Sequence, residues 1–305
     1  MAENLFTKQA ALMVRVLLLV SKHADFALHG GTAINFFVRE MPRFSVDIDL
    51  TFLPILSWAE TLSSISEKLL SLSEDILDKI PNVKIEQKKY PDSESIVKLF
   101  IKSGNIIVKI EPNLIIRGTV MGTEKRRMVR TAEECFKNHI TIQTLSVSQL
   151  YGSKICAALD RQHPRDLFDI MHLFRNEGLT DEIRSAFILY LLCHNRTMSE
   201  ILSPDIKDME KVFNEEFYGM SFENLSYEEL NKNLIMLIKK INADLTLDER
   251  KFIISYKKCE PDWSLFSFPS ARNLPAVKWK LENLRKMSKL KHKVSIEKLE
   301  KILLK

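Results

Sequence analysis

The sequence has 305 residues and a formal net charge of +5, and its apolar and charged fractions of 45% and 28% are ordinary for a globular protein. These values argue against a disordered or fibrous chain, and the length favours about two domains with a large core. Eight glycines are few and seventeen phenylalanines are many, which is typical of a mainly helical, well-packed protein. The positive charge permits a polyanionic partner without requiring one.

The N-terminal apolar run at residues 14–20 is short and follows an amphipathic start that contains Lys8 and Arg15. No small-residue cleavage site follows it, so we expect a core helix over residues 5–23 and neither a signal peptide nor a membrane span. The four cysteines are widely spread, with no CxxC pair and no Cys/His metal spacing. We therefore expect reduced thiols, a cytoplasmic protein and no membrane partner.

The most informative stretch is residues 26–52, which reads FALHGGTAINFFVREMPRFSVDIDLTF. Its apolar start predicts a strand over 26–28, and two glycines then predict a turn into a helix over 33–39. An extended run over 46–52 carries Asp47 and Asp49. Because strand side chains alternate, these carboxylates share one face, while Val46, Ile48 and Leu50 point to the other.

Both ends of this stretch suit a nucleoside triphosphate. Gly30 and Gly31 permit backbone conformations that expose N–H groups to phosphate, and Thr32 adds a hydroxyl at the helix start. Carboxylates at short spacing suit a hard cation such as Mg2+, with Mn2+ as the alternative. A glycine turn alone is usually only a turn, and an Asp-x-Asp alone is often a solvated strand end. Their combination across one helix is much more specific and indicates an NTP with its metal.

The following segments predict a helix over residues 57–80, with Ser57 as N-cap, and an extension of the sheet. Alternating runs begin at residue 83 and occupy residues 96–102 and 106–111, with Gly104-Asn105 as a hairpin signal. Glu111 ends the last run on the same face as Lys109. The basic segment 117–130 is expected to be a loop that either contacts RNA phosphates or is simply a solvated surface.

A second polar constellation lies at residues 145–169. LSVSQLYGSKICAALDR predicts a helix over 146–161 with Lys154 in its middle, and HPRDLFDI predicts a helix that starts at Pro164. Asp166 and Asp169 lie side by side on that second helix. Taken alone, a lysine in mid-helix is normally a surface residue, and an aspartate in a first turn normally complements the helix dipole.

The remaining chain predicts a helical bundle, with helices over residues 181–193, 199–217, 226–241, 247–257, 276–287 and 295–304 and with Asp181 and Ser226 as caps. The last segment is strongly basic: it contains Lys278, Lys280, Arg285, Lys286, Lys289, Lys291, His292 and Lys293. It either binds acceptor RNA through phosphate contacts or forms a solvated, amphipathic surface.

The motifs GGTA, RxSxDIDL, KxxAxxxR and RDxxD follow one another in the order that resembles the AbiEii-type, MenT-like nucleotidyltransferases. These are the toxins of bacterial abortive-infection and toxin–antitoxin pairs, in a superfamily shared with DNA polymerase beta. Three later segments, at residues 247–249, 261–263 and 274–280, also resemble the family's tail. The resemblance implies an α+β fold: an N-terminal minimal nucleotidyltransferase domain over 1–178, with a mixed sheet flanked by helices, and a C-terminal helical bundle over 179–305.

The resemblance also implies residue roles. Mg2+ would be held by Asp47 and Asp49, with Glu111 either as a third ligand or as an exposed sheet-edge charge. The triphosphate would be bound by Gly30, Gly31, Thr32, Arg43, Lys154 and Arg165, although Arg165 can instead be a structural ion-pair partner.

One of Asp166 and Asp169 would position or deprotonate the acceptor hydroxyl, or orient Lys154, and Asp169 is the favoured of the two. The implied activity is Mg2+-dependent transfer of NMP from an NTP to an acceptor hydroxyl. The expected acceptor is the 3′ end of tRNA, and the expected protein partner is a cognate antitoxin. The alternatives are transfer to a small molecule or a protein side chain, and a nucleotide-binding protein that has lost catalysis. The intact Asp47, Asp49, Lys154 and Asp169 argue against such a loss.

Overall fold

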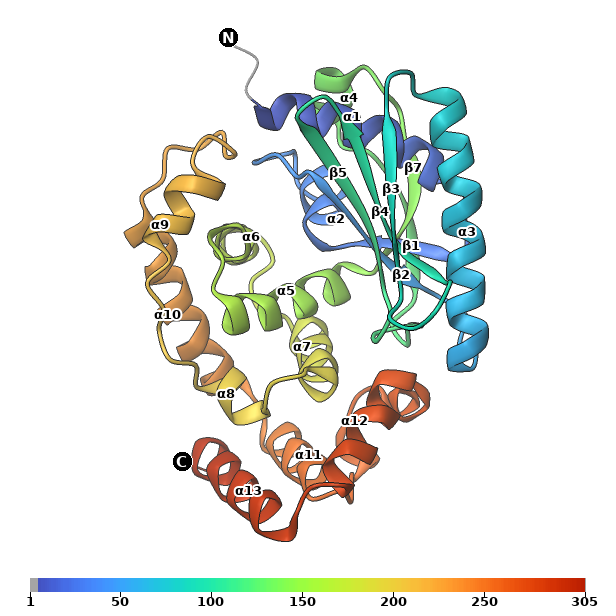
Figure 1. Cartoon of the computed structure of the whole chain (residues 1–305). Helices are drawn as coiled ribbons and strands as arrows, with labels where there is room; N and C mark the ends of the chain where they lie inside the picture. The colour runs from blue at the N-terminus through green and yellow to red at the C-terminus, as the bar shows by residue number, and fades with distance from the viewer. Residues whose placement is uncertain (1–4, 305) are drawn as a thin grey trace. The chain divides into compact units, whose positions relative to one another are not determined.

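The computed structural model describes residues 5–304, which form two compact units (Figure 1). The first unit contains the chain up to Ser146 and a short segment from much later in the sequence, Gly219–Glu223, which we call the return segment. The second unit contains Val147–Tyr218 and the chain from Asn224 onward. The domain boundary predicted at residue 178 concerns independent folding and stays a prediction.

The first unit is built on a seven-stranded sheet with the strand order β3-β4-β5-β2-β1-β7-β6. The strand that carries the two aspartates, β2, lies in the middle of the sheet and pairs antiparallel with β1 and parallel with β5. The predicted mixed sheet is therefore confirmed. The strands are β1 (Phe26–His29), β2 (Asp47–Phe52), β3 (Lys84–Lys89), β4 (Ile96–Ser103), β5 (Ile106–Asn113), β6 (Thr123–Arg127) and β7 (Thr141–Leu145).

Helices in this unit cover the apolar side of the sheet. Ser57 caps α3 as predicted and forms a reciprocal capping box with Glu60. α3 packs against β4 and α1 against β5. The alternate apolar side chains of these strands are consequently fully buried, namely Leu99, Ile101, Val108 and Ile110, and each such burial contributes about 1.5–3 kcal/mol. The helices of the unit are α1 (Leu5–Val20), α2 (Gly30–Phe37), α3 (Trp58–Lys79) and α4 (Arg130–Phe136).

The basic segment 117–130 is not a continuous loop, so the prediction of a loop for the whole segment was wrong. Its residues Thr123–Arg127 form β6, which pairs antiparallel with β7 at one edge of the sheet. The strand reads TEKRR and has no apolar alternation. Charged side chains are common on edge strands because they discourage pairing with other chains, and they also remove the pattern by which a strand is recognised.

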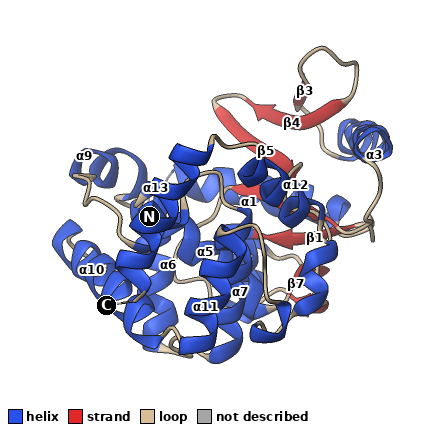
Figure 2. Cartoon of the chain, turned by 90° about the horizontal axis from the view of Figure 1, so that it is seen from below, coloured by secondary structure: helices blue, strands red, loops and turns tan. Residues whose placement is uncertain are grey.

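The second unit is helical throughout, as predicted, and Figure 2 shows helices in blue and the strands of the first unit in red. Ser226 caps its helix through the predicted capping box, whereas Thr180 takes the capping position predicted for Asp181. The helix predicted over 199–217 is interrupted, and Pro204 follows the end of its first part. The α-helices are α5 (Val147–Arg161), α6 (Pro164–Arg175), α7 (Asp181–Cys193), α8 (Met198–Leu202), α9 (Glu210–Val212), α10 (Tyr227–Asp244), α11 (Leu247–Lys257), α12 (Pro275–Arg285) and α13 (Lys289–Leu303).

Close contact between α5 and α7 depends on a glycine. A Cβ atom at Gly152 would lie 2.6 Å from the backbone carbon of Ala186 and 2.7 Å from the backbone nitrogen of Phe187. Real side chains do not approach a backbone so closely, so only glycine fits at this position. Within residues 5–304, no helix has the length and apolar character needed to cross a bilayer.

Candidate functional site

The glycine turn lies between β1 and α2 and makes room for two charged side chains. Gly30 has φ +70°, and a Cβ atom there would overlap the carboxylate oxygen Oδ2 of Asp49. A Cβ atom at Gly31 would lie 2.8 Å from Nη2 of Arg43. The two glycines predicted to bind phosphate therefore also allow an aspartate and an arginine of the next motif to approach the turn.

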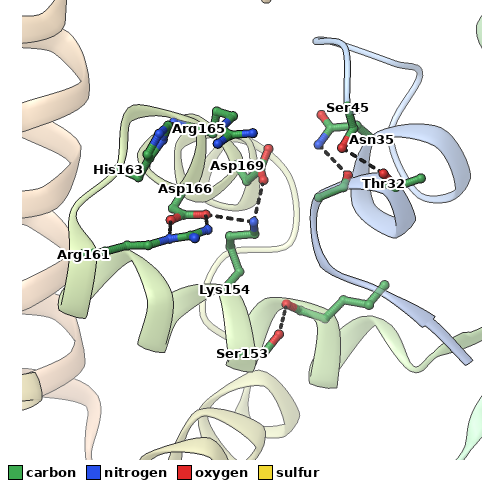
Figure 3. Close-up of polar contacts among 12 residues, drawn as sticks. Thr32, Asn35, Ser45, Ser153, Lys154, Arg161, His163, Arg165, Asp166 and Asp169 are labelled. Atoms are coloured by element: carbon green, nitrogen blue, oxygen red, sulfur yellow. Dashed lines mark hydrogen bonds and ion pairs between the residues drawn. The ribbon is translucent and has the colours of Figure 1, made fainter. Parts of the chain in front are cut away.

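Thr32 fixes the start of α2 to β2. Its side chain is fully buried, and its hydroxyl lies 2.9 Å from Oγ of Ser45 (Figure 3). The same hydroxyl donates a hydrogen bond to the carbonyl of Asp47 at 2.5 Å. The hydroxyl thus joins the glycine motif to the strand that carries the aspartates. Its predicted contact with the NTP stays a prediction. Ser45 is the serine of the RxSxDIDL motif, and the motif alone indicates no role for it.

The two aspartates share one face of β2, as predicted, while Ile48 and Leu50 between and after them are fully buried on the other. The register of the parallel pair β2–β5 places Asp49 opposite Glu111 and Asp47 opposite Lys109. Neighbours in register point to the same face of a sheet, so all four charges lie on one side.

Lysines accompany these carboxylates in the structure. Nζ of Lys109 lies 3.5 Å from Oδ1 of Asp47, and Nζ of Lys98 lies 2.5 Å from Oε1 of Glu111. No group of three or more His, Cys, Asp or Glu side chains within residues 5–304 is arranged to hold a metal ion. The donor chemistry nevertheless fits Mg2+, because Asp47 and Asp49 present hard oxygen ligands on one face and the sheet register supplies Glu111 beside them.

Arg43 is buried, with 2% of its surface exposed, and the return segment helps to hold it. Its Nη1 donates a hydrogen bond to the carbonyl of Phe44 at 2.8 Å and lies 3.9 Å from Sδ of Met220. The backbone of Arg43 forms a β-bridge with Ser221. A guanidinium that is fixed in this way beside Gly31 is oriented before any ligand binds.

The return segment is attached to the motif that precedes β2 by further contacts. The backbone N–H of Phe44 donates to the carbonyl of Met220 at 2.9 Å, and that of Phe222 donates to Pro42 at 3.1 Å. The rings of Phe44 and Phe222 meet edge to face with centroids 4.8 Å apart. Sequence reasoning missed this segment, because YGMSFE has no strand pattern and its partner lies in a distant part of the chain.

The second constellation forms one buried ionic network in the second unit. Nζ of Lys154 on α5 lies 3.0 Å from Oδ1 of Asp166 and 3.1 Å from Oδ2 of Asp169, which project together from α6 (Figure 3). Arg161 forms a bidentate pair with Asp166, at 2.5 Å from Nε and 2.9 Å from Nη2. The side chains of both aspartates have no exposed surface, and that of Lys154 has only 7%. Lys154 is therefore not an ordinary surface lysine of a helix.

Two cations control the protonation of Asp166. Burial raises the pKa of this carboxyl, but the charges of Lys154 and Arg161 and their hydrogen bonds more than offset that effect and hold it well below its usual range. Asp166 is therefore ionised at neutral pH despite its burial. A buried carboxylate of this kind is stable only while both partners remain, because an unpaired buried charge is very costly.

The turn between α5 and α6 brings the network together. Gln162 has φ +56°, is buried, and fixes the turn by donating from its amide to the carbonyl of Asp205 and accepting from the N–H of Lys207. His163 caps α6 by accepting a hydrogen bond from the N–H of Arg165 through Nδ1. Burial lowers the pKa of His163, which favours the neutral ring that this cap requires.

Arg165, a predicted phosphate ligand, lies near an acidic side chain of its own unit. Its Nη2 is 3.8 Å from Oε2 of Glu216, which also lies 3.1 Å from Nε2 of His163. The ion-pair alternative for Arg165 therefore has a partner, and its contact with phosphate stays a prediction. No local pattern in the sequence pointed to Glu216, since it is far from the RDxxD motif.

Two comparisons with known proteins agree with each other. A profile of the nucleotidyl transferase AbiEii toxin family, described as a type IV toxin–antitoxin system, matches residues 11–283. Among solved structures, the chain is similar to MenT4, a nucleotidyltransferase toxin from Mycobacterium tuberculosis H37Rv, with a TM-score of 0.63 and 14% identity over 93% of this chain and 95% of that one. This structural similarity shows a shared fold. A search of curated proteins found no match. The family profile covers most of the length of the chain, which therefore belongs to the AbiEii nucleotidyltransferase toxin family.

Proposed function

We propose that this nucleotidyltransferase transfers NMP from an NTP to the 3′-terminal hydroxyl of a tRNA, with Mg2+ as cofactor and a cognate antitoxin as partner. The observation that carries the proposal is the pair of carboxylates on β2, Asp47 and Asp49, beside the Gly30-Gly31 turn. The family supplies the reaction class. The tRNA acceptor and the preference for Mg2+ come from the resemblance of the motifs.

In this reaction the acceptor hydroxyl releases its proton to solvent and its oxygen forms a bond to the α-phosphorus of the NTP. The bond from the α-phosphorus to the bridging oxygen of the β-phosphate breaks, and pyrophosphate leaves. Asp47 and Asp49 would hold Mg2+, with Glu111 as a candidate third ligand, and Mg2+ would supply alignment and charge neutralisation. The glycine turn and the Thr32 segment would receive the triphosphate, and Arg43 would contact it with a guanidinium that is already oriented.

The second-unit network would also serve the triphosphate. Lys154 would neutralise its charge, with Arg165 as an additional phosphate contact. Asp166 and Asp169 would orient Lys154, because both carboxylates are buried and lie about one hydrogen bond from its Nζ. Their burial favours this positioning role over direct deprotonation of the acceptor hydroxyl.

The test is incubation of the purified protein with each labelled NTP, Mg2+ and total tRNA. The expected result is labelled tRNA, with the label lost when Mg2+ is chelated and restored when Mg2+ is added back. Label on the protein itself or on a small molecule would overturn the tRNA acceptor. NTP binding without any transfer would overturn the catalytic assignment.

A variant pair tests the metal ligands. Asp49→Asn should abolish transfer while the protein remains folded, whereas Asp92→Asn removes an exposed acid and should leave transfer unchanged. Asp92 has φ +54°, a conformation that asparagine also adopts readily, so the control is mild. Growth arrest on expression, relieved by a neighbouring gene, would support the antitoxin partner.

A further inference from the structure

The sheet face that carries the two aspartates continues across β5 and β4 to the edge strand β3. The register pairs Asp47 on β2 with Lys109 on β5, Lys109 with Phe100 on β4, and Phe100 with Glu86 on β3. Partners in register point to the same side of a sheet. One continuous row therefore leads from the predicted metal ligands to the outer edge of the sheet.

Lysines dominate this face. Lys84 is opposite Lys102, and Lys88 is opposite Lys98, on either side of the row that contains Phe100. With Lys109, the face holds five lysines, against Glu86 and Glu111 outside the aspartate motif. We call this surface the lysine face, and define it by Lys84, Lys88, Lys98, Lys102, Lys109 and Phe100.

The lysine face points away from the core. The intervening residues of β4 and β5 are fully buried beneath α3 and α1, whereas the Lys102 and Lys109 side chains are each 41% exposed. Lys84 and Lys88 on the edge strand are also exposed. The alternation of buried apolar and exposed basic residues therefore gives this part of the sheet one basic surface.

The ion pairs on this face are of a kind that a phosphate can replace. Lys102 pairs with Glu86, and Lys98 pairs with Glu111, but each pair is partly solvated. Such pairs are weak and are screened by salt. Lys98 also lies over the Phe100 ring at 5.9 Å, so the face combines a cation with an aromatic surface on which a base can stack.

We propose that the lysine face binds the sugar-phosphate backbone of the acceptor RNA, on the 5′ side of the hydroxyl that receives the nucleotide. This inference rests on the proposed function, because it needs a polynucleotide acceptor. An RNA whose 3′ end lies at Asp47 and Asp49 has its preceding phosphates near these residues. From β2 to β3 the sheet offers three strand spacings, or about 14 Å, which matches about four nucleotides at 3.4 Å each.

The double variant Lys84→Gln/Lys88→Gln tests the proposal, because these lysines are exposed on the edge strand and lie three strands from β2. Each lost phosphate contact should reduce the slope of log affinity against log salt by about 0.7, so two lost contacts weaken binding about 25-fold at 0.1 M salt. Fluorescence anisotropy with 5′-labelled total tRNA measures the affinity, and KM for tRNA should rise in parallel. The dissociation constant for NTP should stay unchanged.

The matched control is Lys232→Gln/Lys239→Gln, which removes the same charge from exposed positions on α10. The proposal is overturned if wild-type protein labels tRNA but the β3 variant keeps its affinity and salt slope, or if the control loses as much. The proposal is also overturned if the β3 variant still binds tRNA as the wild type does but no longer binds an acidic protein partner. Failure of the wild-type protein to label any RNA would instead refute the proposed function.

Discussion

Replacing Gly30 by alanine tests whether the close approach of the glycine turn to Asp49 is needed for catalysis. Gly30 has φ +70°, and an added Cβ atom would overlap Oδ2 of Asp49 and lie 3.1 Å from its Cβ. Alanine at this position must therefore adopt a left-handed backbone and also displace the carboxylate that we assign to the metal.

The two effects have different sizes and different consequences. The left-handed backbone costs about 1–2 kcal/mol for a residue with a Cβ atom. Moving the Asp49 side chain away from its rotamer adds about 0.5–1.5 kcal/mol, so the free energy of unfolding should fall by about 1.5–3.5 kcal/mol. Displacement of a reacting or metal-binding group by about 1 Å costs about 100-fold in rate, so transfer should fall at least that much.

Gly122 provides a matched control for the backbone cost. It has φ +77°, but a Cβ atom there would meet nothing within 4 Å. Gly122→Ala should therefore lose about 1–2 kcal/mol in urea unfolding and keep its transfer activity. Stability is measured by urea titration and activity by single-turnover transfer of labelled NMP, both at a temperature where each variant is folded.

Equal activity in the two glycine variants would refute the reasoning, because it would mean that the position of Asp49 beside the turn does not matter for the reaction. A loss of activity in Gly122→Ala as large as in Gly30→Ala would also contradict it, since backbone strain alone would then explain the result.

Three further predictions concern packing, charge and the return segment. Gly152→Ala should overpack α5 against α7 and lower the urea midpoint, at a cost of about 1–3 kcal/mol, and an unchanged midpoint would show that these helices can separate freely. Asp166→Asn should lower the free energy of unfolding by about 1.5–3 kcal/mol at pH 7, because Arg161 loses its buried partner and Lys154 keeps Asp169 but loses its second carboxylate. The pKa of Asp166 is lower in the folded than in the unfolded protein, so its stabilising effect is complete above about pH 4 and is lost as the pH falls further. Urea titrations from pH 7 to pH 3 should therefore show a smaller acid-induced loss of unfolding free energy in the variant than in the wild type. Phe222→Ala should remove an aromatic contact worth about 1 kcal/mol and raise the dissociation constant for NTP in calorimetry, because Phe44 then holds the Arg43 segment less firmly; unchanged NTP binding would argue against that role.

The local parts of the fold could be predicted because neighbouring residues encode them. Alternation around Asp47 and Asp49 gave the correct face of β2, and Ser57 and Ser226 gave correct helix starts. The spacing of Asp166 and Asp169 placed them together on α6, as the structure shows. In each case a period or a cap decides the structure within a few residues.

The non-local parts could not be predicted, since they depend on which distant segments meet. The parallel register that puts Glu111 beside Asp49 is fixed by the packing of the whole sheet. The strand β6 has no apolar face to reveal it, and the bidentate pair of Arg161 with Asp166 depends on the left-handed turn at Gln162. From the sequence alone, a lysine in mid-helix such as Lys154 is predicted to be exposed, because the sequence does not show that buried carboxylates lie beside it in the folded protein.

The return segment also sets an order of events during synthesis of the chain. Arg43 and Met220 are 177 residues apart, yet their contact helps to place the guanidinium beside Gly31. At about 5–20 residues per second, the ribosome needs about 9–35 seconds to make the intervening chain. The sheet with its aspartates can form well before that time, whereas the support of Arg43 waits until the return segment has emerged. In a nascent chain, Arg43, which we propose as a triphosphate ligand, therefore lacks this support until most of the protein has been made.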